Sequence, residues 1–355
     1  MARPLIPVRD DLQLFSGYHS PQVAVDVRLN TNESPYPPPR GWLDALQQEI
    51  AAIPFNRYPD RQAVALRTAL AELHGVRPDQ VFAANGSNEV LLLLLLAYGG
   101  PGRTAAVFEP TYALHSHIAR VTGTSVVEGA RRDDFTLDLD EVRRVLTLGP
   151  EVTFLCSPNN PTGRVERRGD VVAVAQAAPG LVVVDEAYGQ FASWSALDLV
   201  SDDESVVVAR TYSKTWSMAA ARLGYLVGPA PLVAELDKVA LPYHLDAVKQ
   251  AAGRLALRYR PEMEARVAAL VEERGRLTAA FAELPLETWP SESNFILFRP
   301  TTVPGHVVWE RLLERSVLVR DCSSWPNLDG CLRVTVGTPD ENGAFLAALK
   351  EALSA

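Results

Sequence analysis

The chain of 355 residues has little cysteine, no block of basic residues and no long apolar run. Its three cysteines, Cys156, Cys322 and Cys331, neither form an even set for disulfides nor stand at metal-ligand spacing. A net charge of −9 without a basic tail disfavours nucleic acid or an anionic membrane as the main partner. The composition therefore predicts a reduced protein that handles small molecules.

Membrane and export signals are also missing. The longest apolar run, VLLLLLLAY at 90–98, is too short to span a bilayer and is typical of a buried helix. The N-terminus, MARPLIPVRDDLQLF, lacks the apolar stretch and cleavage site of a signal peptide. No histidine stands in a His-Glu-x-x-His arrangement, so we expect no metal centre. We expect a soluble, cytoplasmic protein.

What the chain does contain is apolar sequence, 47% of all residues, cut into short runs that alternate with helical patterns. Strands that are apolar on both faces and separated by helices indicate a mostly parallel sheet covered on both sides. This pattern predicts an α/β fold. The runs are QVFAA, TAAVFE, TSVVEG, VTFLC, LVVVDE, SVVVAR and LGYLVG.

The length and the change of pattern along the chain predict more than one domain. Residues 1–41 form an N-terminal arm with the Pro-rich stretch ESPYPPPRG, and 42–245 form a large α/β domain that starts with two amphipathic helices. Residues 246–355 form a smaller α+β domain. Its predicted elements are a long helical stretch at 246–284, then SNFILFRP, HVVWERLLERS, VLVRD, CLRVTVG and a last helix from Glu341.

Four loops after predicted strands have the composition of a ligand site, because open α/β sheets bind ligands at the carboxyl ends of their strands. In AANGSNEV, Gly86 and Ser87 lead directly into a helix whose free N–H groups suit a phosphate. A plain capped turn, with Ser87 or Asn88 as the N-cap, is the alternative. In FLCSPNNPTGRV, Asn160 stands where its amide could donate a hydrogen bond into a site, although a simple turn also fits.

The other two loops carry charge. LVVVDEAYGQF ends a buried strand on Asp185, which requires a metal or a cationic partner, and a cationic organic group fits better because no second acidic cluster is evident. ARTYSKTWSMAAARLGYLVG surrounds Lys214 with small and hydroxyl residues. A desolvated lysine is a nucleophile towards carbonyls, whereas a lysine at a helix start is the structural alternative. Taken together with Arg222, the four loops suit pyridoxal phosphate, which has an aldehyde, a phenolate oxygen, a ring nitrogen and a phosphate.

In this order, SPNNPTG, DEAY and TYSK followed by Arg222 resemble the motifs of the fold-type I pyridoxal-phosphate-dependent aminotransferases. RLNTNESPYPPP, NRYPD, SNFILFRP, VLVRD and LRVTVGTPDEN are most similar to the histidinol-phosphate aminotransferase family, and the resemblance covers nearly the whole chain. It implies a homodimer that converts L-histidinol phosphate and 2-oxoglutarate to 3-(imidazol-4-yl)-2-oxopropyl phosphate and L-glutamate in histidine biosynthesis. An aromatic aminotransferase, a phosphothreonine decarboxylase and a non-catalytic cofactor-binding protein are the alternatives.

The resemblance also implies a role for each matching residue of the cofactor site. Lys214 would form the Schiff base, Asp185 would pair with the ring nitrogen, and Asn160 and Tyr188 would bind the phenolate oxygen. Tyr112 would stack on the ring, and Tyr58 would reach the cofactor of the neighbouring subunit. The phosphate would be bound by Gly86, Ser87, Thr211, Ser213 and Arg222, with Asn88 beside them.

For the substrate, Arg333 matches a carboxylate-binding arginine and Arg320 a second anion-binding arginine, a pair that suits a phosphate monoester and a glutamate carboxylate in turn. Tyr18, Asn32 and Tyr243 match positions that line the substrate pocket. Around Tyr18 the chain reads SGYHS, where the family commonly has Pro-Tyr. We interpret Trp194, Trp216, Trp309 and Trp325 as packing residues, and His115 and His117 as helix residues without a catalytic role.

Overall fold

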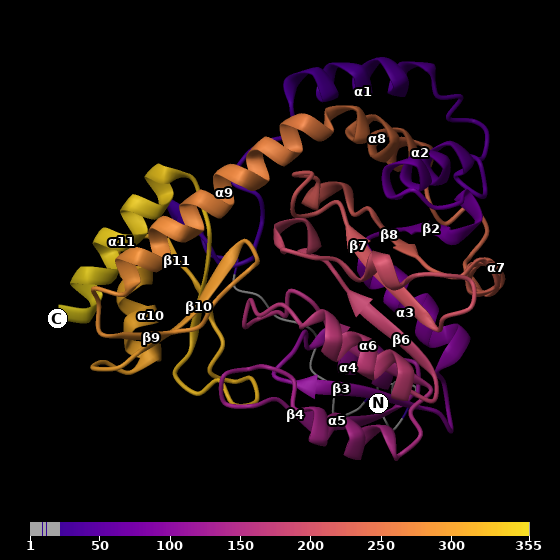
Figure 1. Cartoon of the computed structure of the whole chain (residues 1–355). Helices are drawn as coiled ribbons and strands as arrows, with labels where there is room; N and C mark the ends of the chain where they lie inside the picture. The colour runs from indigo at the N-terminus through magenta and orange to yellow at the C-terminus, as the bar shows by residue number, and fades with distance from the viewer. Residues whose placement is uncertain (1–8, 10–11, 13–21, 355) are drawn as a thin grey trace, which may run out of the picture.

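The computed structural model describes Arg9, Leu12 and residues 22–354. Figure 1 shows a large central sheet with helices on both faces, and a smaller C-terminal part in orange and yellow. The long helix α9 (Arg260–Phe281) runs from one part to the other. This arrangement confirms the predicted α/β fold class, while the exact domain boundaries stay a prediction.

The central sheet has seven strands in the order β2-β8-β7-β6-β5-β3-β4. Each of the seven predicted apolar runs forms one of these strands. The sheet is parallel except at β8, which runs antiparallel to both of its neighbours. The connection from β7 to β8 contains a 3-10 turn but no α-helix, and antiparallel neighbours need no helical crossover. The strands are β2 (Val81–Ala84), β3 (Thr104–Glu109), β4 (Ser125–Ala130), β5 (Val152–Cys156), β6 (Leu181–Asp185), β7 (Val206–Thr211) and β8 (Gly224–Val227).

Both faces of this sheet are buried, as the continuous apolar runs predict. Val183 of β6 packs into one core with helices α3 and α7, whereas its neighbours Val182 and Val184 pack into another with α5 and α6. This division follows from the two-residue period of a strand. The covering helices are α2 (Val64–His74), α3 (Ser87–Tyr98), α4 (Leu114–Val121), α5 (Leu139–Leu146), α6 (Arg168–Ala177), α7 (Ala230–Val239) and α8 (Ala247–Ala256).

Two predicted helix positions at the start of the large part agree with the structure. The helix α1 (Arg40–Ala52) lies across α8, and α2 ends one residue before Gly75. Gly75 has a φ of 66°, a left-handed conformation that terminates helices and favours glycine. The predicted helical stretch 246–284 consists of α8 and α9, separated by a short 3-10 turn.

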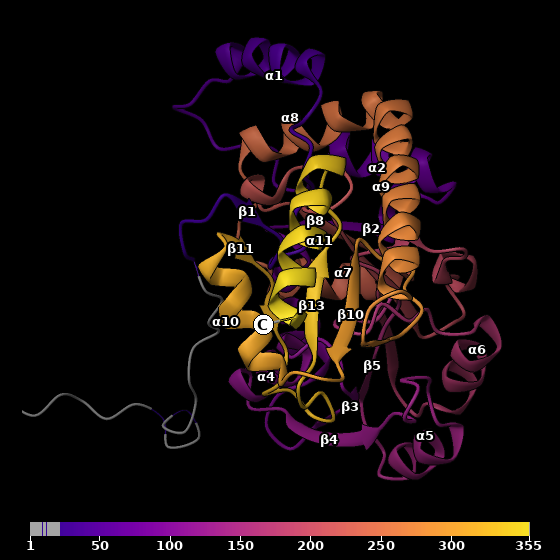
Figure 2. The ribbon, with the colours of Figure 1, turned by 90° about the vertical axis from the view of Figure 1, so that its left-hand side faces the viewer.

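The C-terminal part packs helices against a four-stranded antiparallel sheet of order β12-β13-β10-β9. A separate parallel pair joins β1 of the N-terminal segment to β11, so this segment returns to the C-terminal part. The elements are β1 (Val27–Arg28), β9 (Leu286–Thr288), β10 (Phe295–Pro300), α10 (Gly305–Glu314), β11 (Val317–Leu318), β12 (Arg320–Asp321), β13 (Leu332–Thr335) and α11 (Pro339–Ser354). Figure 2 shows α10 and α11 over β13 and β10. Within the described residues, no helix has the length and apolar character needed to cross a membrane.

Candidate active site

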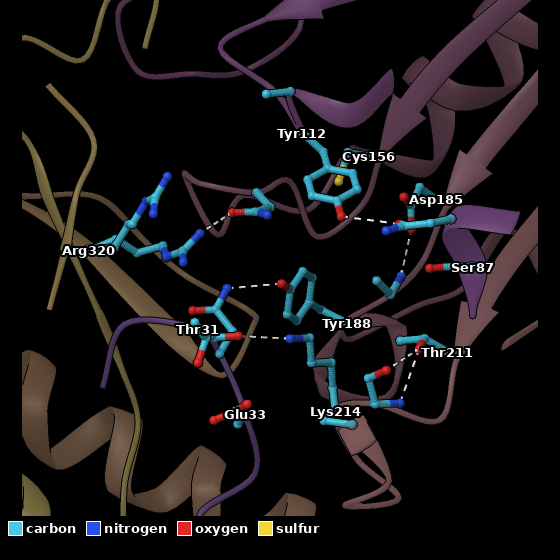
Figure 3. A pocket seen from close by; sticks show the side chains of 18 of the residues that line it. Thr31, Glu33, Ser87, Tyr112, Cys156, Asp185, Tyr188, Thr211, Lys214 and Arg320 are labelled. Atoms are coloured by element: carbon cyan, nitrogen blue, oxygen red, sulfur yellow. Dashed lines mark hydrogen bonds between the residues drawn. The ribbon is translucent and has the colours of Figure 1, made fainter. Parts of the chain in front are cut away.

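A cavity of about 380 Å³ lies at the carboxyl ends of β5, β6 and β7, and residues from all four predicted loops line it (Figure 3). The C-terminal part closes it from the other side with side chains of β12 and β13. The predicted site residues that line the cavity are Asn32, Ser87, Asn88, Tyr112, Asn160, Asp185, Tyr188, Thr211, Ser213, Lys214, Arg222, Arg320 and Arg333.

Lys214 points into this cavity three residues after the end of β7. Its Nζ donates a hydrogen bond to the carbonyl oxygen of Thr31 at 3.0 Å. Burial, assisted by the charges of Arg333 and Arg222 and opposed by Glu33, lowers the pKa of Lys214 from 10.5 to about 7. A large fraction of the amine is therefore neutral near neutral pH, which is the form that attacks a carbonyl.

The turn between β2 and α3 and the loop after β7 form a cradle of donors. Gly86 has a φ of 85°, and a Cβ there would lie 2.9 Å from Arg222 Nη2. Gly224 is equally constrained, because a Cβ would lie 2.3 Å from the backbone nitrogen of Ser87. Arg222 Nη1 in turn donates to Ser213 Oγ at 3.2 Å. A guanidinium, a helix N-terminus and hydroxyls that converge in this way fit a phosphate.

Asp185 ends β6 and is 1% exposed. One carboxylate oxygen accepts a hydrogen bond from the backbone of Ala187 at 3.0 Å, and the other lies 3.0 Å from His115 Nε2. His115 is fully buried and stacks on Phe154 with ring centres 4.8 Å apart. The interpretation of His115 as a helix residue is correct for α4 but incomplete, because the side chain also contacts the predicted ring-nitrogen partner.

Two aromatic residues stand near this carboxylate. Tyr112 meets the ring of His115 edge-on and donates from its hydroxyl to Asn88 Oδ1 at 3.2 Å. Tyr188 accepts a hydrogen bond from Asn32 Nδ2 at 2.9 Å, and burial raises the pKa of its phenol. Tyr188 therefore stays protonated at physiological pH and can act as a hydrogen-bond donor.

Arg333 is buried and held by two oxygens and a ring. It donates to Asn160 Oδ1 and, at 3.0 Å, to the carbonyl oxygen of Asn30, and its guanidinium lies 5.0 Å from the ring centre of Phe295. Its Nε is buried and has no hydrogen-bond partner among the described residues. Because Asn160 uses its oxygen towards Arg333, its amide nitrogen remains the donor that can serve a cofactor oxygen.

Tyr58 and Tyr243 do not line the cavity in the single chain. Their rings stack on each other, 4.4 Å apart, and Tyr58 is 80% exposed. Gly86 acts through the backbone beside the cavity rather than as a lining side chain. Tyr18 lies outside the described residues.

Sequence reasoning missed several lining residues, among them Thr31, Glu33, Cys156 and Trp325. Thr31 and Glu33 flank Asn32 in RLNTNESPY, and this adjacency was the signal that could have found them. Trp325 was interpreted as a packing residue, and nothing in the surrounding sequence distinguishes the two roles.

These features define a site for an aldehyde cofactor with a phosphate, and the chain belongs to the family of class I and II aminotransferases, whose pattern matches residues 24–349. It is therefore a pyridoxal-phosphate-dependent transferase.

Proteins with similar sequences support the resemblance seen in the motifs. The chain is 45% identical over 357 residues to the histidinol-phosphate aminotransferase of Rhodococcus jostii (strain RHA1), covering 98% of this chain and 93% of the relative. It is 44% identical over 354 residues to the histidinol-phosphate aminotransferase of Mycobacterium avium (strain 104), covering 97% and 88%. The structure of histidinol-phosphate aminotransferase from Sinorhizobium meliloti in complex with pyridoxal-5'-phosphate has the same fold, with a TM-score of 0.85, 24% identity and coverage of 93% and 91%. The resemblance seen in the sequence is thereby confirmed.

Proposed function

We propose that this enzyme transfers the amino group of L-histidinol phosphate to 2-oxoglutarate, in histidine biosynthesis. The observation that carries the proposal is the pair Arg320 and Arg333, which stand directly opposite each other on β12 and β13 in the cavity that holds Lys214. Two guanidinium groups suit the phosphate of one substrate and a carboxylate of the other. The names of the relatives at 43–45% identity support the same substrate.

Pyridoxal phosphate, when bound, supplies an aldehyde and an electron-withdrawing ring. Lys214 Nζ would hold the cofactor at its aldehyde, and as a free amine it would take up and return a proton at the substrate carbon, a task that suits a pKa near neutrality. Asp185 would hold a proton on the ring nitrogen, because its buried carboxylate needs a cationic partner. Tyr188 and Asn160 would donate to the phenolate oxygen.

The remaining residues would position the cofactor. The cradle of Gly86, Ser87, Thr211, Ser213 and Arg222 would bind its phosphate, since each offers an N–H or O–H donor. Tyr112, joined to Asn88 by a hydrogen bond, would cover one face of the ring. Asn32 would line the substrate side and hold Tyr188 in place.

We further propose a cytoplasmic homodimer in which Tyr58, and Tyr243 stacked on it, reach the neighbouring active site. Next to these stacked rings in the chain, Phe55 and Leu241 are also exposed, at 71% and 76%. Apolar side chains gathered on a surface are typical of an interface. Each subunit would consist of two domains: residues 42–245 would hold the cofactor, and residues 246–355 would carry the substrate-binding arginines.

A panel of amino donors assayed with 2-oxoglutarate tests the substrate assignment. We expect stoichiometric glutamate from L-histidinol phosphate and a far lower kcat/KM for phenylalanine and tyrosine. Comparable kcat/KM values for the aromatic amino acids would favour the aromatic aminotransferase. Release of carbon dioxide from phosphothreonine, without glutamate, would assign the decarboxylase instead.

A further inference from the structure

The indole of Trp325 forms part of the cavity wall, next to the outer of the two arginines. The guanidinium carbon of Arg320 lies 5.9 Å from the centre of the Trp325 ring. Both side chains line the cavity together with Arg333. This half-buried tryptophan is thus placed on the substrate side of the site.

The backbone around Trp325 is held by consecutive turns. Its N–H donates to the carbonyl oxygen of Cys322 at 3.0 Å, and its own carbonyl accepts from Leu328 at 3.2 Å. Cys322 also donates to the carbonyl oxygen of Cys331 at 3.0 Å, which closes the loop between β12 and β13. Cys322, Leu328 and Cys331 are all fully buried, so they anchor the loop in the core. The indole is therefore presented from a supported position.

Arg320, the arginine beside Trp325, lies opposite a second positive charge. Arg320 and Arg333 are register partners on antiparallel strands, and like charges directly opposite each other repel. Arg333 is fixed by its bonds to Asn160 and Asn30. A cation attracted to an aromatic face keeps its orientation without losing its hydrogen-bond donors, because the ring uses none of them.

We propose that Trp325 is a specificity-determining residue, which positions Arg320 to receive the phosphate of the substrate. The proposal rests on the proposed substrate, a phosphate monoester, but the tryptophan acts through the arginine and does not touch the reacting atoms. Without the indole, the guanidinium of Arg320 loses this contact, and we expect its interaction with the anion to weaken.

The test compares Trp325→Phe and Trp325→Leu with Trp289→Leu in the holoenzyme. Trp289 is a matched control, since its ring lies 5.3 Å from the guanidinium of Arg299 in the same sheet and it does not line the cavity. We expect Trp325→Leu to raise the KM for histidinol phosphate and the inhibition constant of inorganic phosphate about threefold to tenfold. The kcat and the absorption spectrum of the cofactor should change little, Trp325→Phe should fall between, and Trp289→Leu should match the wild type.

A double-mutant cycle with Arg320→Gln decides whether Trp325 acts through the arginine. In the Arg320→Gln background, Trp325→Leu should have no further effect on phosphate inhibition. A persisting effect, or wild-type phosphate inhibition in both single Trp325 variants, would overturn the proposal. Inorganic phosphate is the probe because its inhibition of the enzyme can be measured with any amino donor that the enzyme accepts. A wild-type enzyme that is inactive on histidinol phosphate would disprove the proposed substrate and leave this test intact.

Discussion

The amino nitrogen of Lys214 lies 3.0 Å from the carbonyl oxygen of Thr31, a residue 183 positions earlier in the chain. A carbonyl oxygen accepts a hydrogen bond from an ammonium or from a neutral amine, so it orients the group without neutralising it. Burial, and then the nearby positive charges of Arg333 and Arg222, favour the neutral form by lowering the pKa. Orientation and activation of this lysine thus come from different residues.

Replacing Lys214 by alanine should abolish turnover while the fold and non-covalent binding of pyridoxal phosphate persist. Binding would persist because the phosphate cradle and Asp185 do not depend on the amine. Borohydride reduction of the wild-type holoenzyme followed by peptide mapping should label Lys214 among the chain's four lysines, the others being Lys238, Lys249 and Lys350. Turnover at the wild-type rate in the variant would disprove the assignment.

The stability of the apoenzyme should depend on pH through the same lysine. In the native protein the amine has a pKa of about 7, against 10.5 for an ordinary lysine, so between these values the unfolded chain binds more protons. Stability then rises with pH across this interval. Lys214→Met should therefore stabilise the apoenzyme near pH 7 and have less effect near pH 10, as measured by urea unfolding. An equal effect at both pH values would contradict the lowered pKa.

His115→Ala should remove a hydrogen-bond partner of Asp185 and thereby lower both the stability of the protein and its retention of the cofactor. Removing one hydrogen-bond partner of a buried carboxylate costs about 1–3 kcal/mol. We expect a loss of unfolding free energy of this order, together with faster release of the cofactor during dialysis. His117→Ala, on the same helix but half-buried and away from the cavity, is the control. Wild-type stability and cofactor retention in His115→Ala would show that the contact with Asp185 is dispensable.

Arg333→Ala should raise the KM for both substrates strongly, while the enzyme retains its cofactor during dialysis. Its guanidinium contacts Asn160, Asn30 and the Phe295 ring but none of the residues of the phosphate cradle. Loss of a charge-assisted pair predicts a rise of about tenfold or more. Loss of the cofactor from the variant would place Arg333 at the cofactor instead.

Mixing two defective variants tests whether Tyr58 serves the neighbouring subunit. Lys214→Ala and Tyr58→Ala homodimers each carry a defect in both sites, but a mixed dimer contains one intact site. Dissociation and reassociation of an equal mixture should restore about a quarter of wild-type activity above the sum of the separate samples. If the activity of the mixture stays equal to the sum of the separate samples after subunit exchange has been verified, Tyr58 serves the site of its own subunit.

Much of the fold could be predicted because its strands are runs of β-branched residues. The valine-rich runs LVVVDE and SVVVAR clearly predict strands. In the structure they form adjacent strands whose ends carry Asp185 and Thr211. The strands β1 and β9 were not predicted, since two or three residues give no detectable periodicity. The antiparallel direction of β8 depends on a loop conformation that its composition does not specify.

Contacts between distant segments could not be predicted from the residues alone. His115 and Asp185 are 70 positions apart, and their contact arises only when α4 packs against β3 and β4 in the folded sheet. Trp325 gave no sequence signal, because a half-buried tryptophan in a loop has the same neighbours in the chain whether it packs on a core or faces a ligand. The residues of the cofactor motifs were found because each follows a strand end directly.

The parallel pair of β1 and β11 has a mechanical consequence. Beyond β1, Leu29 is bonded on both sides, from its N–H to Leu318 and from its carbonyl oxygen to the N–H of Thr335. The carbonyl of Asn30 is bonded to Arg333, and that of Thr31 to Lys214. One short segment thus ties Arg333, the proposed anion ligand, to the oxygen that holds the Lys214 amine. We therefore expect a displacement of β13 on anion binding to reach Lys214 through three consecutive residues.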